Sequence, residues 1–185
     1  MSVYVTEDRS RIYKGEVLGF RIDTLRYGRH VPIKREVVEH PGSVVIIPVT
    51  SSGTVLLVSQ WRHAAGDFLL EAPAGTIDLA DKSPVETAQR ELREEIGYRA
   101  TNLEPLSSFW IAPGWCSEYM YAYVATGLTV DPLEQDMDEE ITVAEHRLDE
   151  IPVLIKSGEI RDSKSIAALL MASQFHKLQE TDWSA

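Results

Sequence analysis

Apolar and polar positions along the first 40 residues follow a pattern typical of extended chain. Residues 12–27 and 31–39 are rich in β-branched and aromatic side chains, and a glycine lies between the two runs. Two further apolar runs, 43–49 and 54–60, are joined by a Ser-Ser-Gly tripeptide. The pattern predicts a small antiparallel N-terminal sheet, followed by a β-hairpin in a buried sheet.

The chain then changes from extended to helical periodicity. Residues 71–83 contain proline and glycine and predict irregular chain. A helix is expected to follow, with Ser83 as its N-cap, Pro84 at its first position and Glu86 in a capping box. Gly97 is expected to end it. Four apolar residues recur at helical spacing and predict its buried face: Val85, Ala88, Leu92 and Ile96.

The C-terminal part of the chain alternates strands with short helices. The expected elements are strands at 106–111, 119–126 and 141–146, a loop over 127–140, and a helix at 151–157 that ends at Gly158. A last helix is expected from a cap at Asp162 or Ser163 to about Lys177. Strands mixed with two or three helices predict an α+β fold, with a sheet between helices.

Composition narrows the classes of partner. The chain has 185 residues and a formal net charge of −11, and this acidic balance argues against a nucleic-acid-binding protein. A single cysteine fits a reducing cytoplasm. The polar N-terminus is unlike a signal peptide, and no apolar run approaches the roughly 20 residues of a membrane span. We therefore expect a cytoplasmic protein with no membrane partner.

Three glutamates stand on one face of the helix expected after Ser83. Glu91, Glu94 and Glu95 are spaced i, i+3 and i+4. Like charges at this spacing destabilise an isolated helix by about 0.2–0.5 kcal/mol per pair, and a hard divalent cation removes that penalty. A solvated acidic face is the alternative interpretation of the three glutamates alone. Arg90, one turn before Glu94, is placed to fix the rotamer of that glutamate.

Residues around these glutamates carry a family resemblance. Gly75 followed by Arg90-Glu-Leu-Arg-Glu-Glu-Ile-Gly97 resembles the Nudix box, G-x5-E-x7-R-E-U-x-E-E-x-G-U, where U is aliphatic. Three positions depart from the pattern. Fourteen residues separate Gly75 from Arg90, one more than the pattern has. Lys82 stands where the pattern, counted back from Arg90, has its first glutamate, and Tyr98 replaces the last aliphatic residue.

The resemblance implies the Nudix fold over about residues 43–178, a mixed sheet sandwiched between helices. Residues 1–42 would form the separate N-terminal sheet region, and residues 43–185 the hydrolase domain. The resemblance also implies a site for two or more Mg²⁺ or Mn²⁺ ions. Its ligands would be the carboxylates of Glu91 and Glu95 and the backbone carbonyl of Ala74, with Glu94 supporting them or binding another ion.

Segments outside the box resemble the ADP-ribose pyrophosphatase subfamily. Pro113 lies sixteen residues beyond Gly97, and Glu118 follows it. Arg35 and Arg62 lie in segments similar to those that flank the first hairpin of that subfamily, and guanidinium groups suit a diphosphate. The commoner fate of a single arginine is surface ion pairing. The resemblance further implies a homodimer in which the N-terminal sheet reaches the partner's site.

The reaction implied is hydrolysis of ADP-ribose to AMP and ribose 5-phosphate. The subfamily draws a base or a further metal ligand from a mobile loop, and here the acidic run 136–140 offers Glu139 first and Glu140 second. A solvated acidic turn is the alternative for that run. Other diphosphates, such as GDP-mannose or a dinucleotide, and a non-catalytic nucleotide-binding module remain the alternative functions.

Overall fold

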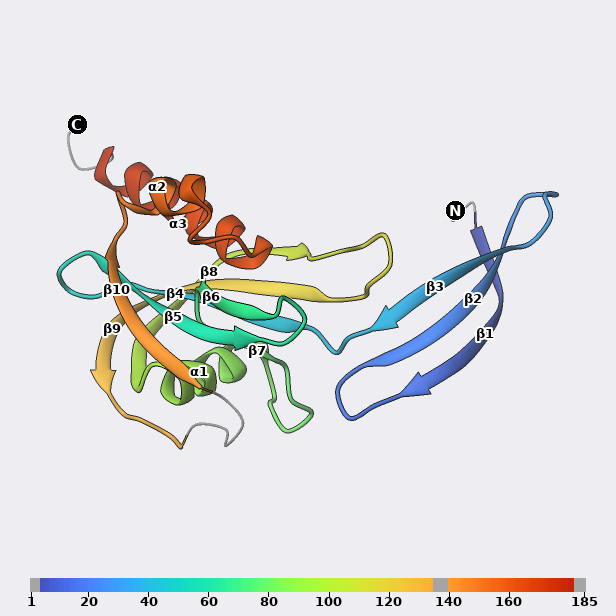
Figure 1. Ribbon diagram of the computed structural model, residues 1–185, viewed down its shortest axis with the longest axis horizontal. Coiled ribbons are helices and arrows are strands. Elements are labelled where there is room, and N and C mark those ends of the chain that lie inside the picture. The colour runs from blue at the N-terminus through green and yellow to red at the C-terminus, as the bar shows by residue number, and fades with distance from the viewer. Residues whose placement is uncertain (1–3, 135–139, 182–185) are drawn as a thin grey trace. The chain divides into compact units, whose positions relative to one another are not determined.

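The computed structural model describes residues 4–134 and 140–181. The chain forms two compact units, one made of Met1–Gly42 with Phe109–Met120 and the other of Ser43–Ser108 with Tyr121–Ala185 (Figure 1). Strands in three sheets and three helices give an α+β fold, as the sequence predicted. None of the helices in the described part of the chain combines the length and hydropathy that a membrane crossing requires.

The first unit contains the predicted antiparallel sheet. Its strands are β1 (Tyr4–Lys14), β2 (Gly19–Tyr27) and β3 (Ile33–Glu39), in the order β1-β2-β3. The prediction of one extended stretch over 12–27 was wrong, because the chain turns between β1 and β2, where the Gly15 N–H donates to the Leu18 carbonyl at 2.8 Å. Strand β1 is exposed along its whole length, so its polar residues gave no alternating signal.

The second unit contains two sheets. Its strands are β4 (Ser43–Pro48), β5 (Thr54–Arg62), β6 (Asp67–Glu71), β7 (Ala74–Thr76), β8 (Tyr98–Trp110), β9 (Tyr119–Val130) and β10 (Ile141–Arg147), of which β8 and β9 extend into the first unit. The sheet orders are β7-β4-β9-β8 and β10-β5-β6.

Strands β4 and β5 do not form the predicted hairpin within one sheet. They belong to different sheets, and the chain passes from one to the other at the Val49–Val55 bridge. All six residues of β4 are buried, and β5 is buried at most of its positions. Each strand therefore lies between two neighbours in its own sheet. A continuous apolar run is compatible with this arrangement as well as with a hairpin.

The strand predictions for the later chain were too short. Strand β8 begins at Tyr98 instead of residue 106, and β9 extends to Val130 into the predicted loop. The three-residue strand β7 lies in the segment predicted to be irregular. Strand β8 is at the edge of its sheet and is mostly exposed, so polar residues occupy it without breaking its hydrogen bonds.

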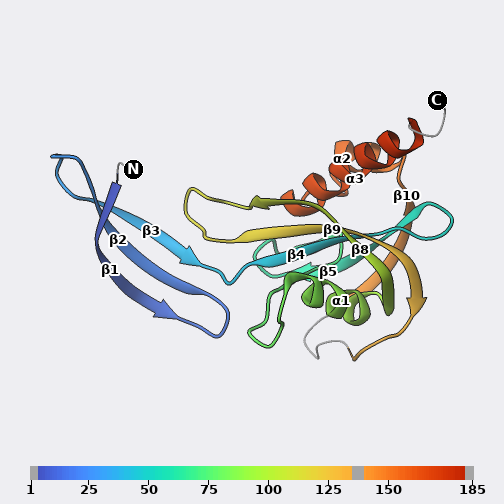
Figure 2. The ribbon, with the colours of Figure 1, turned by 180° about the vertical axis from the view of Figure 1, so that it is seen from behind.

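Three helices complete the second unit: α1 (Pro84–Glu95), α2 (Ile151–Ser157) and α3 (Ser163–Thr181). Helix α1 lies on one side of the strands, and α2 and α3 lie on the other (Figures 1 and 2). The predicted start and end signals of α1 are confirmed, as are the predicted range and end of α2. Ser83 caps α1, and Gly97 and Gly158 follow the two helices with φ of +74° and +83°.

The core of the second unit packs one face of α1 against the sheets. Ala88, Leu92 and Ile96 are buried there, as predicted, together with apolar residues of β4 and β5. Val85 was wrongly assigned to this face, since its side chain is 42% exposed. Glu86 beside it is also exposed, so the first turn of α1 leaves the core. The buried face thus begins at the second turn, and Arg90 and Glu94 of the box lie on the partly exposed face of α1.

Candidate active site

The carboxylates of α1 are held against the segment that precedes the helix. Glu95 is 2% exposed, and one of its carboxylate oxygens accepts a hydrogen bond from the Ala74 N–H at 3.0 Å. Glu91 is also buried, whereas Glu94 is partly exposed. The segment 71–75 therefore folds back on the helix. The contact described is made by the Ala74 amide, while a role for its carbonyl stays a prediction.

Gly75 is required by the close approach of Glu91. A Cβ at this position would lie 1.8 Å from Glu91 Oε1 and 1.9 Å from its carboxyl carbon. Any side chain larger than hydrogen would displace that carboxylate, which is itself buried. Glycine is therefore needed at this position because a side chain would clash with Glu91, and not because the backbone adopts an unusual angle.

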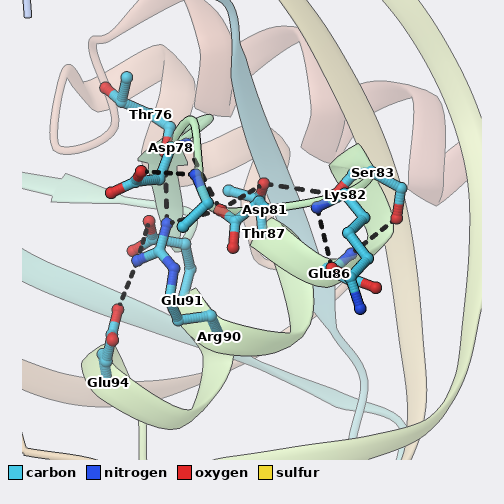
Figure 3. Close-up of polar contacts among 11 residues, drawn as sticks. Thr76, Asp78, Asp81, Lys82, Ser83, Glu86, Thr87, Arg90, Glu91 and Glu94 are labelled. Carbon is cyan, nitrogen blue, oxygen red and sulfur yellow. Dashed lines mark hydrogen bonds and ion pairs between the residues drawn. The ribbon is translucent and has the colours of Figure 1, made fainter.

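Arg90 is the hub of the polar contacts around the box (Figure 3). Its Nη1 lies 2.7 Å from Glu94 Oε2 and 2.9 Å from Glu91 Oε1. Its Nη2 donates to the Thr76 carbonyl at 3.3 Å and lies 3.2 Å from Asp81 Oδ2. Burial opposes the charge of the guanidinium, but the neighbouring carboxylates outweigh it and raise the pKa of Arg90. The prediction that Arg90 fixes Glu94 is confirmed.

Asp81 is a site residue that the sequence reading missed. Its carboxylate accepts hydrogen bonds from Thr87 Oγ1 at 2.9 Å and from Arg90 at 3.2 Å. Burial raises the pKa of Asp81, but these two hydrogen bonds outweigh it and hold that pKa below its ordinary value. Counted forward from Gly75, Asp81 stands where the box pattern has its first acid.

Asp81, and not the residue at position 82, therefore supplies the acid of this loop. Arg90 does have its carboxylate partner in this loop, and the additional residue lies between Asp81 and the helix. Lys82 is exposed, and its backbone N–H donates to the Glu86 carboxylate at 2.9 Å as part of the helix cap. Counting from the glycine as well as from the arginine would have found Asp81.

The donor chemistry of this face fits a hard divalent cation. It offers carboxylate oxygens on one helix face, and the bare Gly75 leaves room for the Glu91 carboxylate against the backbone. Among residues 4–134 and 140–181, no three carboxylate, imidazole or thiol side chains are gathered as a set of metal ligands. In the geometry described, Arg90 and the Ala74 amide contact the oxygens of these glutamates.

A second charged cluster surrounds Glu71, at the end of β6. The side chain of Glu71 is 1% exposed. Arg62 donates to it through Nε, at 3.1 Å to either oxygen, and through Nη2 at 2.7 Å. Lys164, in the first turn of α3, contacts the same carboxylate. Sequence reasoning named Arg62 but missed Glu71 and Lys164, because their pairing joins residues 93 positions apart.

The other predicted site residues lie elsewhere. Arg35, on β3 of the first unit, is exposed, and its Nη1 donates to the Lys34 carbonyl at 3.0 Å. Pro113 is exposed and Glu118 partly buried, both in the segment 109–120 of that unit. Glu140 is exposed just before β10. Glu139 lies outside the described residues. The structure thus brings Ala74 and the helix glutamates together, and it pairs Arg62 with Glu71.

Known proteins resemble this chain over most of its length. A family model described as the NUDIX domain matches residues 39–169. An ADP-ribose pyrophosphatase from Bacillus subtilis (strain 168) is 32% identical over 174 residues, which cover 93% of this chain and 91% of that protein. A methanol dehydrogenase activator from Bacillus methanolicus is 35% identical over 172 residues, covering 92% and 90% of the two chains.

Two further comparisons widen the range of relatives. A GDP-mannose pyrophosphatase from Yersinia enterocolitica is 32% identical over 146 residues, which cover 74% of this chain and 75% of that protein. The crystal structure of an ADP compounds hydrolase superimposes with a TM-score of 0.85 over 97% of both chains, at 22% sequence identity. That last likeness indicates a shared fold.

Proposed function

The chain belongs to the Nudix hydrolase family, and on that premise we propose that it hydrolyses the diphosphate bond of ADP-ribose to AMP and ribose 5-phosphate. The observation that carries the proposal is the box helix, whose Glu91 and Glu95 are buried against Gly75 and Ala74. The relative from Bacillus subtilis, named as an ADP-ribose pyrophosphatase and similar over nearly the whole chain, supports this substrate.

The helix carboxylates are proposed to hold two or more Mg²⁺ or Mn²⁺ ions. Glu91, Glu95 and the Ala74 carbonyl would be the ligands, with Glu94 as a support or a further ligand. When bound, the ions would neutralise the charge of the diphosphate. Arg90 keeps Glu91 and Glu94 in fixed rotamers, so the oxygens are positioned before substrate arrives.

The remaining roles fall to residues around the substrate. Arg35 and Arg62 are proposed to bind the phosphates, and Pro113 and Glu118 to contact the rest of the substrate. Glu139, or else Glu140, accepts the proton of the attacking water while the water oxygen bonds to phosphorus and the P–O–P linkage breaks. We propose a homodimer in which residues 1–42 contribute to the partner's site, and a cytoplasmic location.

GDP-mannose is the alternative substrate that a specific observation favours. The Yersinia enterocolitica relative is named as a GDP-mannose pyrophosphatase and matches most of this chain. Both reactions break a diphosphate between a nucleoside and a sugar, so the box helix serves either one equally. Contacts to the base and the sugar, and not the box helix, therefore determine which substrate is hydrolysed.

A substrate panel tests the proposal. ADP-ribose, GDP-mannose and a dinucleotide are compared with Mg²⁺ or Mn²⁺, and phosphate is measured after coupling to a phosphatase. The highest kcat/KM is expected for ADP-ribose. A higher value for GDP-mannose would replace the substrate but keep the reaction, whereas nucleotide binding without turnover of any compound would favour a regulatory module.

Two substitutions separate substrate binding from chemistry. Arg62→Ala should raise the KM for ADP-ribose more than it lowers kcat, because a phosphate contact is made in the ground state and in the transition state alike. Glu139→Gln should lower kcat by about 10²–10⁴-fold, the usual effect of removing a positioned base. If Glu140→Gln shows that loss instead, the second glutamate acts. Full activity of the double variant would remove the loop from the mechanism.

A further inference from the structure

The charged cluster around Glu71 joins the first turn of α3 to Arg62 on β5. We propose that Lys164 and Glu71 are positioning residues that hold the Arg62 guanidinium ready for the diphosphate of the substrate. This inference rests on the proposed function, in which Arg62 binds that diphosphate. Neither Lys164 nor Glu71 is proposed to touch the substrate.

The geometry of the Arg62–Glu71 pair fixes the guanidinium. Three N–H···O contacts of 2.7–3.1 Å join Nε and Nη2 to both carboxylate oxygens. This two-point contact sets the plane of the guanidinium as well as its position. The Arg62 side chain remains 35% exposed although Glu71 is 1% exposed. The buried acid thus anchors one side of a cation that solvent and a substrate can reach.

Helix formation alone does not explain a lysine at position 164. It is the second residue of α3, and a cation in the first turn of a helix opposes the helix dipole. Its ammonium contacts Glu71 and lies 2.9 Å from Asp162 Oδ1, and its side chain is only 16% exposed. The position of Lys164 is therefore explained by the two carboxylates that it contacts, Glu71 and Asp162.

Two cations on one buried acid have a specific consequence. If Arg62 were the only partner of Glu71, any shift of Arg62 towards a phosphate would leave a buried charge without compensation, which destabilises a protein strongly. Lys164 contacts Oε2 of Glu71 and keeps that carboxylate paired. Arg62 can then share its charge with the substrate while the Glu71 carboxylate stays neutralised.

The same turn of α3 also holds the chain that leads into the box. Ser165 Oγ accepts a hydrogen bond from the Ala72 N–H at 2.8 Å, next to the Lys164–Glu71 contact. Two residues further on, the Ala74 N–H donates to Glu95. One helix turn therefore sets the start of the segment on which both the arginine and the metal-binding glutamates depend.

The test is Lys164→Met, which keeps the length of the side chain and removes its charge. The KM for ADP-ribose should rise about 3- to 30-fold, as expected for coupled neighbours, while kcat stays within about twofold. Arg161→Met is the matched control. Arg161 also pairs with an acid of β6, Asp67, at 2.6 Å, but both side chains are exposed and neither contacts Glu71. Its KM should not change.

Three more variants make the result decisive. Lys164→Arg should restore the KM, because it keeps the cation. In an Arg62→Ala background, Lys164→Met should cause no additional rise, since its effect passes through Arg62. If Lys164→Met alone is unfolded, Glu71→Gln combined with Lys164→Met removes the buried charge and should fold with a raised KM.

The failure of this inference differs from the failure of the proposed function. If Arg62→Ala raises the KM but Lys164→Met and the Glu71→Gln/Lys164→Met variant do not, the positioning role is overturned and Arg62 stands alone. An additional rise in the Arg62→Ala background would likewise overturn it. If Arg62→Ala leaves the KM unchanged in an active enzyme, Arg62 does not bind the diphosphate, and the premise itself fails.

Discussion

Two charged clusters in the second unit are built from acidic and basic side chains in different proportions. In the first, which we call the acid-rich cluster, the guanidinium of Arg90 contacts the three carboxylates of Asp81, Glu91 and Glu94. Around Glu71 the charges are balanced, because Arg62 and Lys164 contact its carboxylate and Lys164 also pairs with Asp162. The first cluster has acid in excess and suits a metal cation, whereas the second has no excess acid around the partly exposed Arg62 guanidinium, which suits a phosphate. Local charge balance thus gives the two clusters different binding chemistry in a chain whose net charge is −11.

The largest effect should come from removing divalent cations. Activity should vanish in excess chelator and return with Mg²⁺ or Mn²⁺, because Arg90 alone does not balance the negative charge of the acid-rich cluster. The measurement is turnover of ADP-ribose before and after dialysis against the chelator. Full turnover in excess chelator would contradict the assignment of the acid-rich cluster to a metal.

Glu95→Gln should come next in size. Loss of a ligand charge should reduce turnover by more than about 100-fold, since even indirect partners of metal ligands contribute about 10–100-fold. The amide oxygen of Gln can still accept from the Ala74 N–H, so the thermal midpoint should change little. Turnover and calorimetry are measured together. A variant that melts much earlier would give Glu95 a structural role instead.

Gly75→Ala should weaken metal binding by the acid-rich cluster without changing any charge. The added Cβ would meet Glu91 at 1.8 Å, so the carboxylate must move, and overpacking of this kind costs about 1–3 kcal/mol of stability. Mn²⁺ binding, measured by electron paramagnetic resonance, should weaken. Gly114→Ala is the control for stability, because no atom lies within 4 Å of its added Cβ. Equal melting of the two variants would refute the close approach.

The smallest effect is expected from Asp81→Asn, and it should depend on pH. The pKa of Asp81 lies below its ordinary value, so its carboxylate stabilises the fold above the unfolded-state pKa and loses this effect as pH falls through the folded-state value. The variant should be about 0.5–1.5 kcal/mol less stable near pH 7. Denaturant unfolding should show that difference shrinking below about pH 4. A constant difference from pH 7 to pH 3 would exclude this origin.

Local signals made the box helix predictable from the sequence. The Ser83 cap and the glycine at position 97 depend on neighbouring residues alone, and both are where the pattern placed them. The i, i+4 pair of Arg90 and Glu94 is equally local. The prediction failed at Val85 because periodicity describes the direction of a side chain and not where the core ends.

Strand partners were not predictable in the same way. The apolar runs of β4 and β5 matched a hairpin, yet each strand is paired within a different sheet. A buried strand needs neighbours on both sides, and the sequence of one strand does not say which strands supply them. Strands β1 and β8 were incompletely predicted for a different reason. They are mostly exposed, and exposed strands need no apolar pattern.

The sequence by itself determined the family and the glutamates of the acid-rich cluster, because those depend on spacing within one helix and its loop. It also determined the α+β class, because strand and helix patterns are both readable along the chain. The tertiary structure decided which groups surround them. Glu71 meets Lys164 across 93 positions, and Gly75 meets Glu91 across a loop. Packing brings such groups together only after the sheets and helices have assembled. Charge balance at each cluster is therefore a property of the fold.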